Sequence, residues 1–171
     1  MKAPPPLPEE TLRRVHRVAR FDGMSVVAVA GIFALLSAAR HDVSGAVVGV
    51  IVAGAGAVEL HGASLLTHGQ PGGIRWLAGS QLYLLISILG YVAWRLGHPD
   101  PMMLAAMHAA INAEQQQLLR DSGVSEAEFV NLAIRLVYFG VALATVVYQG
   151  GMLIYYMRRR GAVEKALGSE L

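Results

Sequence analysis

The sequence contains no cysteine, and charged residues are scarce. The absence of cysteine excludes disulfides, thiolate metal sites and thiol redox chemistry. Charged residues make up 15% of the 171 residues, whereas an average soluble domain has about 25%. The charges are missing from four separate stretches rather than evenly along the chain. This distribution indicates a membrane protein instead of a soluble domain.

Each of the four stretches approaches the length that crosses a hydrocarbon core of roughly 30 Å. They predict transmembrane helices at residues 23–39, 44–67 and 77–96, and a fourth within residues 126–160 that follows an outer extension of the same helix. We therefore expect an all-α polytopic membrane protein, in which a bundle of four transmembrane helices forms a single membrane domain over residues 1–171.

The segments outside these stretches carry their own helix signals. Residues 1–21 place apolar and basic residues at helical spacing, which predicts a basic amphipathic helix lying on an anionic membrane surface, or else a solvated basic tail. Asp22 is expected to cap the first transmembrane helix. An Asp-Pro pair opens an outer helix over residues 100–122, and a Ser-x-x-Glu box at Ser125 opens the last helix. Together they predict a small extracytoplasmic helical hairpin.

Basic residues predict the orientation of the chain. With a cytoplasmic N-terminus, the inner segments hold Lys2, Arg13, Arg14, Arg17, Arg20, Arg75, Arg158, Arg159, Arg160 and Lys165, and the outer segments hold Arg40, Arg95, Arg120 and Arg135. Because basic residues favour the cytoplasmic side, both termini are predicted to be cytoplasmic, in a bacterial-type inner (plasma) membrane. Residues 36–39 also resemble a signal-peptidase site. Cleavage of residues 1–39 would leave the orientation of the other three predicted transmembrane helices unchanged.

Small residues recur along the second transmembrane stretch. Gly45, Gly49, Ala53 and Gly56 follow one another at three- and four-residue steps, and small residues let membrane helices approach closely. Two interpretations stay open for this stripe. It packs against another helix of the same chain, or it forms the contact of a homo-oligomer.

Glu59 continues the same stripe inside the membrane. A carboxyl group at that depth is costly and marks a candidate functional site. When the stretches are laid out at about 1.5 Å per residue, polar residues of the other three reach a similar depth: Ser25, Gln81, Tyr148 and Gln149. The sequence predicts a polar layer around Glu59, which either handles protons or small ions or only holds the bundle in register.

Histidines raise two questions about bound groups. His41, Asp42, His98 and Asp100 all fall on the predicted outer side, and imidazole with carboxylate suits Zn²⁺ or Mn²⁺; the alternative is that these residues are simply solvated. A haem between helices needs histidines at matched depth. The third and fourth stretches have none at the depth of His61, so we expect no cofactor.

The sequence offers no catalytic motif. It has no HExxH, GxSxG or P-loop pattern, so we do not expect an enzyme, and its basic charge follows topology rather than nucleic-acid binding. Two hypotheses remain. The first is an oligomeric channel-like or transporter-like protein that moves protons or small ions near Glu59. The second is a non-catalytic scaffold or accessory subunit bound to a membrane-protein partner.

Overall fold

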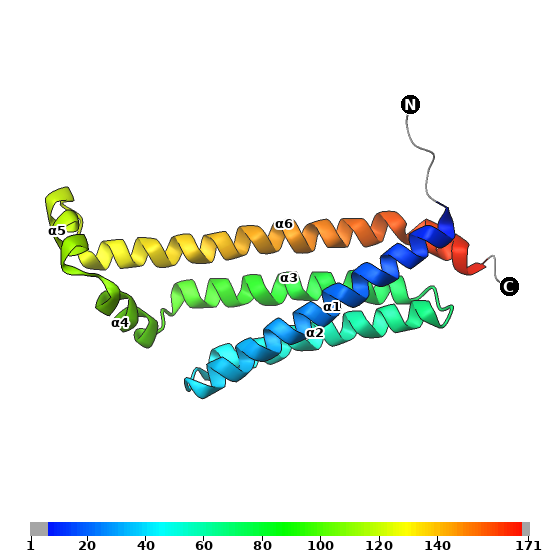
Figure 1. Ribbon diagram of the computed structural model, residues 1–171, viewed down its shortest axis with the longest axis horizontal. Helices are drawn as coiled ribbons and strands as arrows, with labels where there is room; N and C mark the ends of the chain where they lie inside the picture. Colours follow the sequence, from blue (N-terminus) through cyan, green and yellow to red (C-terminus); the bar gives the residue numbers. More distant parts are fainter. Residues whose placement is uncertain (1–6, 169–171) are drawn as a thin grey trace, which may run out of the picture. The chain divides into compact units, whose positions relative to one another are not determined.

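The computed structural model describes residues 7–168, which form helices joined by short turns. The helices are α1 (Pro8–Ala39), α2 (Val43–Thr67), α3 (Gly73–Gly97), α4 (Pro101–Ala110), α5 (Ala113–Ser122) and α6 (Glu126–Gly168) (Figure 1). No strand occurs within residues 7–168. Four helices, α1, α2, α3 and α6, are long and apolar enough to cross a membrane. These observations confirm the predicted all-α class and its four long apolar helices.

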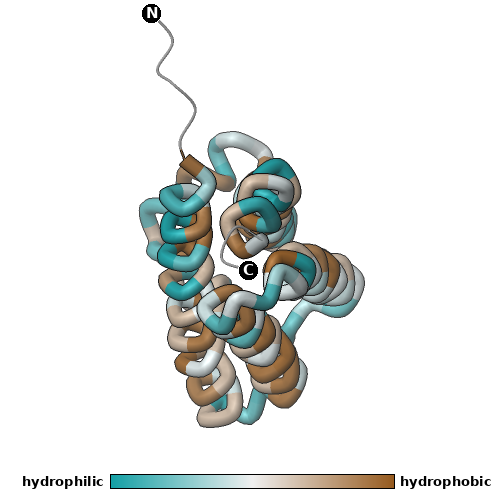
Figure 2. The backbone as a smooth tube through the Cα atoms, turned by 90° about the vertical axis from the view of Figure 1, so that its right-hand side faces the viewer, coloured by the Kyte–Doolittle hydropathy of each residue, from teal (hydrophilic) through white to brown (hydrophobic). Residues whose placement is uncertain are grey.

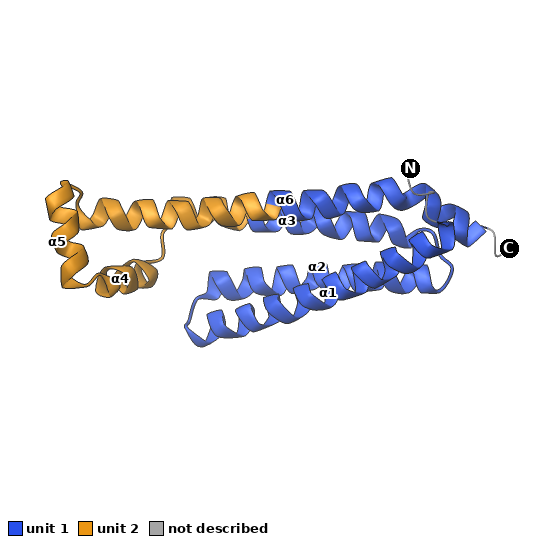
Figure 3. Cartoon of the chain, turned by 45° about the horizontal axis from the view of Figure 1, so that its top comes forward, with its two compact units in different colours: residues 1–88, 146–171 blue, residues 89–145 orange. Residues whose placement is uncertain are grey.

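The described residues divide into two compact units (Figure 3). The first unit contains residues 7–88 and 146–168, and thus α1, α2, most of α3 and the C-terminal half of α6. The second unit contains residues 89–145, with α4, α5 and the adjoining parts of α3 and α6. The residues discussed below as a candidate site all belong to the first unit.

Helix α1 differs from the prediction, because it is continuous where two segments, 1–21 and 23–39, were expected. It has 32 residues, begins with Pro8 in its first turn and passes through Asp22 without a break. Asp22 is therefore a buried mid-helix residue rather than an N-cap. The physical reason is that the Asp22 carboxylate accepts hydrogen bonds from side chains of α3 and α6. It therefore does not cap a helix terminus, and the backbone amides around it are bonded within α1. Residues 1–6 lie outside the described residues.

The N-terminal half of α1 belongs to the core of the first unit. Val15 and Ala19 are fully buried and pack with residues of α2, α3 and α6. The apolar face that predicted a helix lying on the membrane surface is thus covered by protein. Its basic residues, such as Arg13 and Arg17, stay exposed.

Helices α1 and α2 form a tightly packed antiparallel hairpin. The turn contains His41 in the left-handed region (φ 58°), and the Asp42 carboxylate caps α2 by accepting a hydrogen bond from the Gly45 amide at 3.0 Å. A Cβ atom at Gly49 would lie 2.7 Å from the Cβ of Ala34, so only glycine permits this approach. The hairpin therefore depends on small residues where the two helices meet.

The predicted small-residue stripe faces α1 of the same chain. Gly45, Gly49 and Gly56 each lie so close to α1 that an added Cβ would meet its atoms. Ala53 is half-buried. The three glycines are thus used within the chain, as the first of the two interpretations expects.

Large apolar side chains cover the outside of the long helices. Phe21, Val29 and Leu35 of α1 are 76%, 69% and 73% exposed, and Figure 2 shows hydrophobic residues in many turns of the helices. The interior holds alanine and polar residues beside a smaller set of large apolar side chains. Apolar surface exposed to this extent is unfavourable in water and favours apolar surroundings, such as a lipid bilayer.

The predicted outer helix 100–122 is two helices in the structure. Asp100 caps α4 by accepting from the Met102 amide at 2.9 Å, and the chain leaves helical geometry at Ile111. Asn112 then starts α5 through a capping box with Gln115. Asparagine favours such local side-chain bonds over a helix interior, which explains the break.

Helix α6 extends past residue 160, where the sequence predicts its end. Arg160 pairs with Glu164 one turn later, with 2.8 Å between Nε and Oε1, and the buried Val163 and Leu167 anchor the last turns in the core. The run of arginines therefore does not end the helix, because the apolar residues that follow it pack against the core of the first unit.

The packing at Gly49 leads to a stability prediction. Gly49→Ala places a methyl group against the backbone of Ala34 and is expected to destabilise the protein by about 1–3 kcal/mol. Gly54→Ala is the matched control on the same helix, since nothing lies within 4 Å of its added Cβ, and it should cause no loss. Thermal unfolding of both variants in detergent measures the difference, and equal melting temperatures would contradict the packing described.

Candidate functional site

Glu59 and Gln81 lie at the same height in the α2–α3 hairpin. Glu59 is eight residues before the end of α2, and Gln81 is eight residues after the start of α3. At about 1.5 Å per residue, each is about 12 Å from the turn. Because the two helices run in opposite directions, the side chains meet, and both are fully buried.

The α1–α2 hairpin brings Asp22 to the same height. Asp22 is 17 residues before the end of α1, and Glu59 is 16 residues after the start of α2. The Gln81 amide donates a hydrogen bond from Nε2 to Oδ2 of Asp22 at 3.1 Å. The Glu59 carboxyl interacts with both Asp22 and Gln81. Two carboxyl groups and one amide from three helices thus share a buried position.

Helix α6 supplies a tyrosine hydroxyl to each carboxyl group. Tyr156 donates to Oε1 of Glu59 at 2.6 Å, and Tyr148 donates to Oδ1 of Asp22 at 2.7 Å. The Tyr156 side chain is fully buried, whereas Tyr148 is 53% exposed. We refer to Asp22, Glu59, Gln81, Tyr148 and Tyr156 as the carboxyl layer. Through Tyr148, the buried Asp22 is bonded to a side chain that is partly exposed.

The carboxyl layer has more hydrogen-bond acceptors than donors. Within residues 7–168, Oε2 of Glu59 and Oε1 of Gln81 are buried without a hydrogen-bond partner, as is Oε1 of the adjacent Gln149. A buried acceptor without a donor costs about 1–3 kcal/mol. A proton on one carboxyl group, or a small cation beside it, would give a partner to the oxygens of Glu59 and Gln81. The chemistry of the site therefore favours binding of a positive species.

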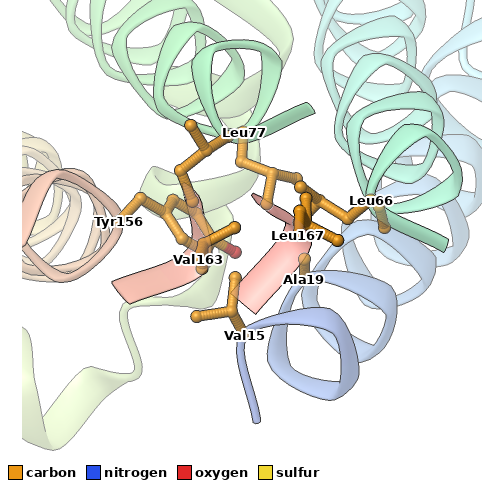
Figure 4. Close-up of a cluster of buried hydrophobic side chains, with 9 residues drawn as sticks. Val15, Ala19, Leu66, Leu77, Tyr156, Val163 and Leu167 are labelled. Atoms are coloured by element: carbon orange, nitrogen blue, oxygen red, sulfur yellow. The ribbon is translucent and has the colours of Figure 1, made fainter. Parts of the chain in front are cut away.

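An apolar cluster lies between the carboxyl layer and the α2–α3 turn. It consists of Val15, Ala19, Ala63, Leu66, Ile74, Leu77, Tyr156, Val163 and Leu167, which come from α1, α2, α3 and α6 (Figure 4). Tyr156 belongs to both features, because its ring packs in the cluster while its hydroxyl reaches Glu59. The cluster closes the layer on this side.

The structure brings together three of the five residues of the predicted polar layer, counting Glu59 itself. Glu59, Gln81 and Tyr148 lie in the carboxyl layer. Gln149 is buried nearby on α6. Ser25 is half-buried, and its hydroxyl makes no hydrogen bond to another residue within 7–168.

Two members of the layer, Asp22 and Tyr156, were missed from sequence. The sequence predicts Asp22 as a helix cap, because it predicts that the first transmembrane helix starts at residue 23. Counting residues from the turn at 40–42 would have placed Asp22 opposite Glu59. The sequence gives no signal for Tyr156, because its ring reaches the layer only through the packing of α6 against the other helices.

The predicted metal ligands have other roles. Within residues 7–168, no three His, Cys, Asp or Glu side chains group as metal ligands. Of the predicted set, His41 and Asp42 belong to the first unit, and His98 and Asp100 belong to the second. Asp42 and Asp100 cap α2 and α4. His98 stacks on Trp94 with 4.0 Å between the ring centroids.

Comparison of the chain with protein-family models, with curated proteins and with solved structures finds no match. Function is therefore inferred from the carboxyl layer itself. Neighbouring carboxyl groups in a medium of low dielectric constant repel one another when both are ionised. A pair that holds one proton or cation between them relieves this repulsion, and tyrosine hydroxyls can both donate and accept hydrogen bonds. The arrangement is suited to taking up and releasing a single positive charge.

The two adjacent tyrosines of α6 provide a matched test of the layer. Tyr156→Phe removes the donor to Glu59 and is expected to destabilise the protein by about 1 kcal/mol. Tyr155 has a buried hydroxyl without a hydrogen-bond partner among the described residues, so Tyr155→Phe should be neutral or stabilising. Unfolding in mixed detergent micelles distinguishes the two, and a larger loss for Tyr155→Phe would contradict the described hydrogen bond.

Proposed function

We propose that the chain is a small, non-enzymatic integral membrane protein that moves protons or small cations through the carboxyl layer. The observation that supports this most strongly is the meeting of Asp22 and Glu59, from two neighbouring helices, in a buried position. Both helices are long and apolar enough to cross a membrane. An ionisable residue in such a helix is expensive and by default functional, and two in contact strengthen the argument.

The surroundings of Asp22 and Glu59 favour the uptake and release of a proton or a small cation. Gln81 holds Asp22 from one side, and the half-exposed Tyr148 holds it from the other. The Tyr148 ring lies on the outside of the long helices, so a proton path through its hydroxyl requires a second copy of the chain to cover it. Tyr156 keeps Glu59 in place at the closed side of the layer.

A single chain with four long helices is small for a complete transport path, so the proposal includes a homo-oligomer. Gly45, Gly49 and Gly56 are occupied by α1, which leaves other apolar surfaces for contact between copies. Large apolar side chains of α6, such as Leu136 and Phe139, are 62% and 67% exposed and are available for such a contact.

The proposed location is a bacterial-type inner membrane, with both termini in the cytoplasm. The support is the distribution of basic residues, ten of which fall in the segments assigned to the inside and four in those assigned to the outside. A protease-sensitive tag on the C-terminus should be cleaved in inverted vesicles and protected in spheroplasts. The reverse pattern would overturn this orientation.

A second candidate function is that of an accessory subunit in a larger membrane complex. Met102 of α4 and Leu118 of α5 are 69% and 63% exposed, on short helices outside the four long ones. Such apolar side chains suit the surface of a protein partner. Isolation from native membranes in a mild detergent should then recover a partner in fixed proportion. A pure homo-oligomer would count against this function.

Flux through reconstituted liposomes tests the first proposal. The wild-type protein should dissipate an imposed proton or cation gradient faster than empty vesicles do. Glu59→Gln and Asp22→Asn should each reduce the rate at least tenfold, because either amide removes one carboxyl group from the pair while preserving its shape.

Glu114→Gln is the control for the flux measurement, since it makes the same chemical change at an exposed residue of α5. Its flux should equal that of the wild type. If the wild type shows no flux above empty vesicles, or if Glu59→Gln transports as fast as Glu114→Gln, transport at the carboxyl layer is refuted.

A further inference from the structure

A basic pocket lies between the N-terminal half of α1 and the C-terminal end of α2. Its volume is about 650 Å³. Four basic residues line it, namely Arg13, His16, Arg17 and Arg20, and Phe21, Met24 and Thr67 are among its other lining residues. All of these residues belong to the first unit. The carboxyl layer does not line this pocket, so the proposed transport leaves it unexplained.

The arginines of the basic pocket are not neutralised by the protein. Arg13, Arg17 and Arg20 follow one another at four- and three-residue steps, so they share one face of α1. All three are exposed, no acidic residue lines the pocket, and none of them makes an ion pair within residues 7–168. By contrast, Arg160 is paired with Glu164. The pocket therefore presents a concentrated positive charge to a ligand.

A hydrogen bond fixes the wall of the pocket. Nε2 of His16 lies 2.9 Å from Oγ1 of Thr67, which joins α1 to the last turn of α2. A smaller cavity of about 320 Å³ shares His16, Arg20 and Thr67 and continues along α2. Because two helices are tied together here, the site is a shaped groove rather than a row of free side chains.

The polarity of the groove changes along α1. After Arg20 come Phe21 and Met24, whose side chains are 76% and 55% exposed and also line the pocket. The helix to which they belong, α1, is long and apolar enough to cross a membrane. A ligand that fits must therefore be anionic at one end and apolar at the other.

We propose that the basic pocket binds an anionic phospholipid. The arginines hold the phosphate, since the guanidinium fork matches phosphate oxygens with two parallel hydrogen bonds, and the acyl chains run along Phe21 and Met24. Basic pockets between transmembrane helices on the cytoplasmic side are suited to such headgroups. This proposal depends on the chain lying in a membrane but not on the carboxyl layer.

Native mass spectrometry of the full chain in detergent tests the proposal. Phosphatidylglycerol and phosphatidylcholine with identical acyl chains are titrated separately. The wild type should retain phosphatidylglycerol at least tenfold more tightly. Arg17→Gln and Arg20→Gln should each weaken that binding about fivefold, with phosphatidylcholine binding unchanged. Arg17→Lys keeps the charge and should weaken it less than Arg17→Gln.

Arg158→Gln is the matched control, because it removes one exposed arginine of the first unit that does not line the pocket. It should leave phosphatidylglycerol binding unchanged, and an equal loss would show that only net charge matters. Excess inorganic phosphate separates a lipid site from a simple anion site, and displacement of the lipid by phosphate alone would overturn the proposal. Equal retention of the two lipids by the wild type would also overturn it. A negative liposome flux has no bearing on these outcomes.

Discussion

The free-energy cost of burying two carboxyl groups among apolar helices governs the structure of the first unit. Asp22 and Glu59 cannot turn outward to water in a bilayer, so their hydrogen-bond donors have to come from other helices. Gln81 of α3 and the two tyrosines of α6 supply them. The carboxyl layer therefore specifies which helices are neighbours and in which register they pack. Apolar contacts alone would specify this weakly, because lipid tails are as apolar as leucine.

Glycine makes the carboxyl pair geometrically attainable. Gly23 follows Asp22 directly, and Gly56 precedes Glu59 by three residues. An added Cβ at Gly56 would lie 2.9 Å from the carbonyl oxygen of Gly23, so the two backbones touch beside the layer. Larger residues would separate α1 from α2 and draw the carboxyl groups apart. Close packing and the polar site are thus two consequences of one helix contact.

Helix α1 contributes residues to three different features of the first unit. Its basic first half lines the pocket proposed for lipid, Val15 and Ala19 pack in the apolar cluster, and Asp22 contributes to the carboxyl layer. Arg20 and Asp22 are two residues apart and therefore point in different directions from the helix. One face meets a charged headgroup, and another meets the buried interior. A rigid helix of this kind keeps both sites at a constant separation.

The sequence by itself determined where the long helices lie and that their surroundings are apolar, because length and hydropathy are local properties of a stretch of chain. It also placed Glu59, Gln81 and Tyr148 at one depth, since the rise per residue of a helix is constant. Only the tertiary structure decided that Asp22 faces Glu59 and that Tyr156 reaches inward. The direction in which a side chain points depends on how helices pack face to face, and that packing is set by glycines and partners far away in the sequence.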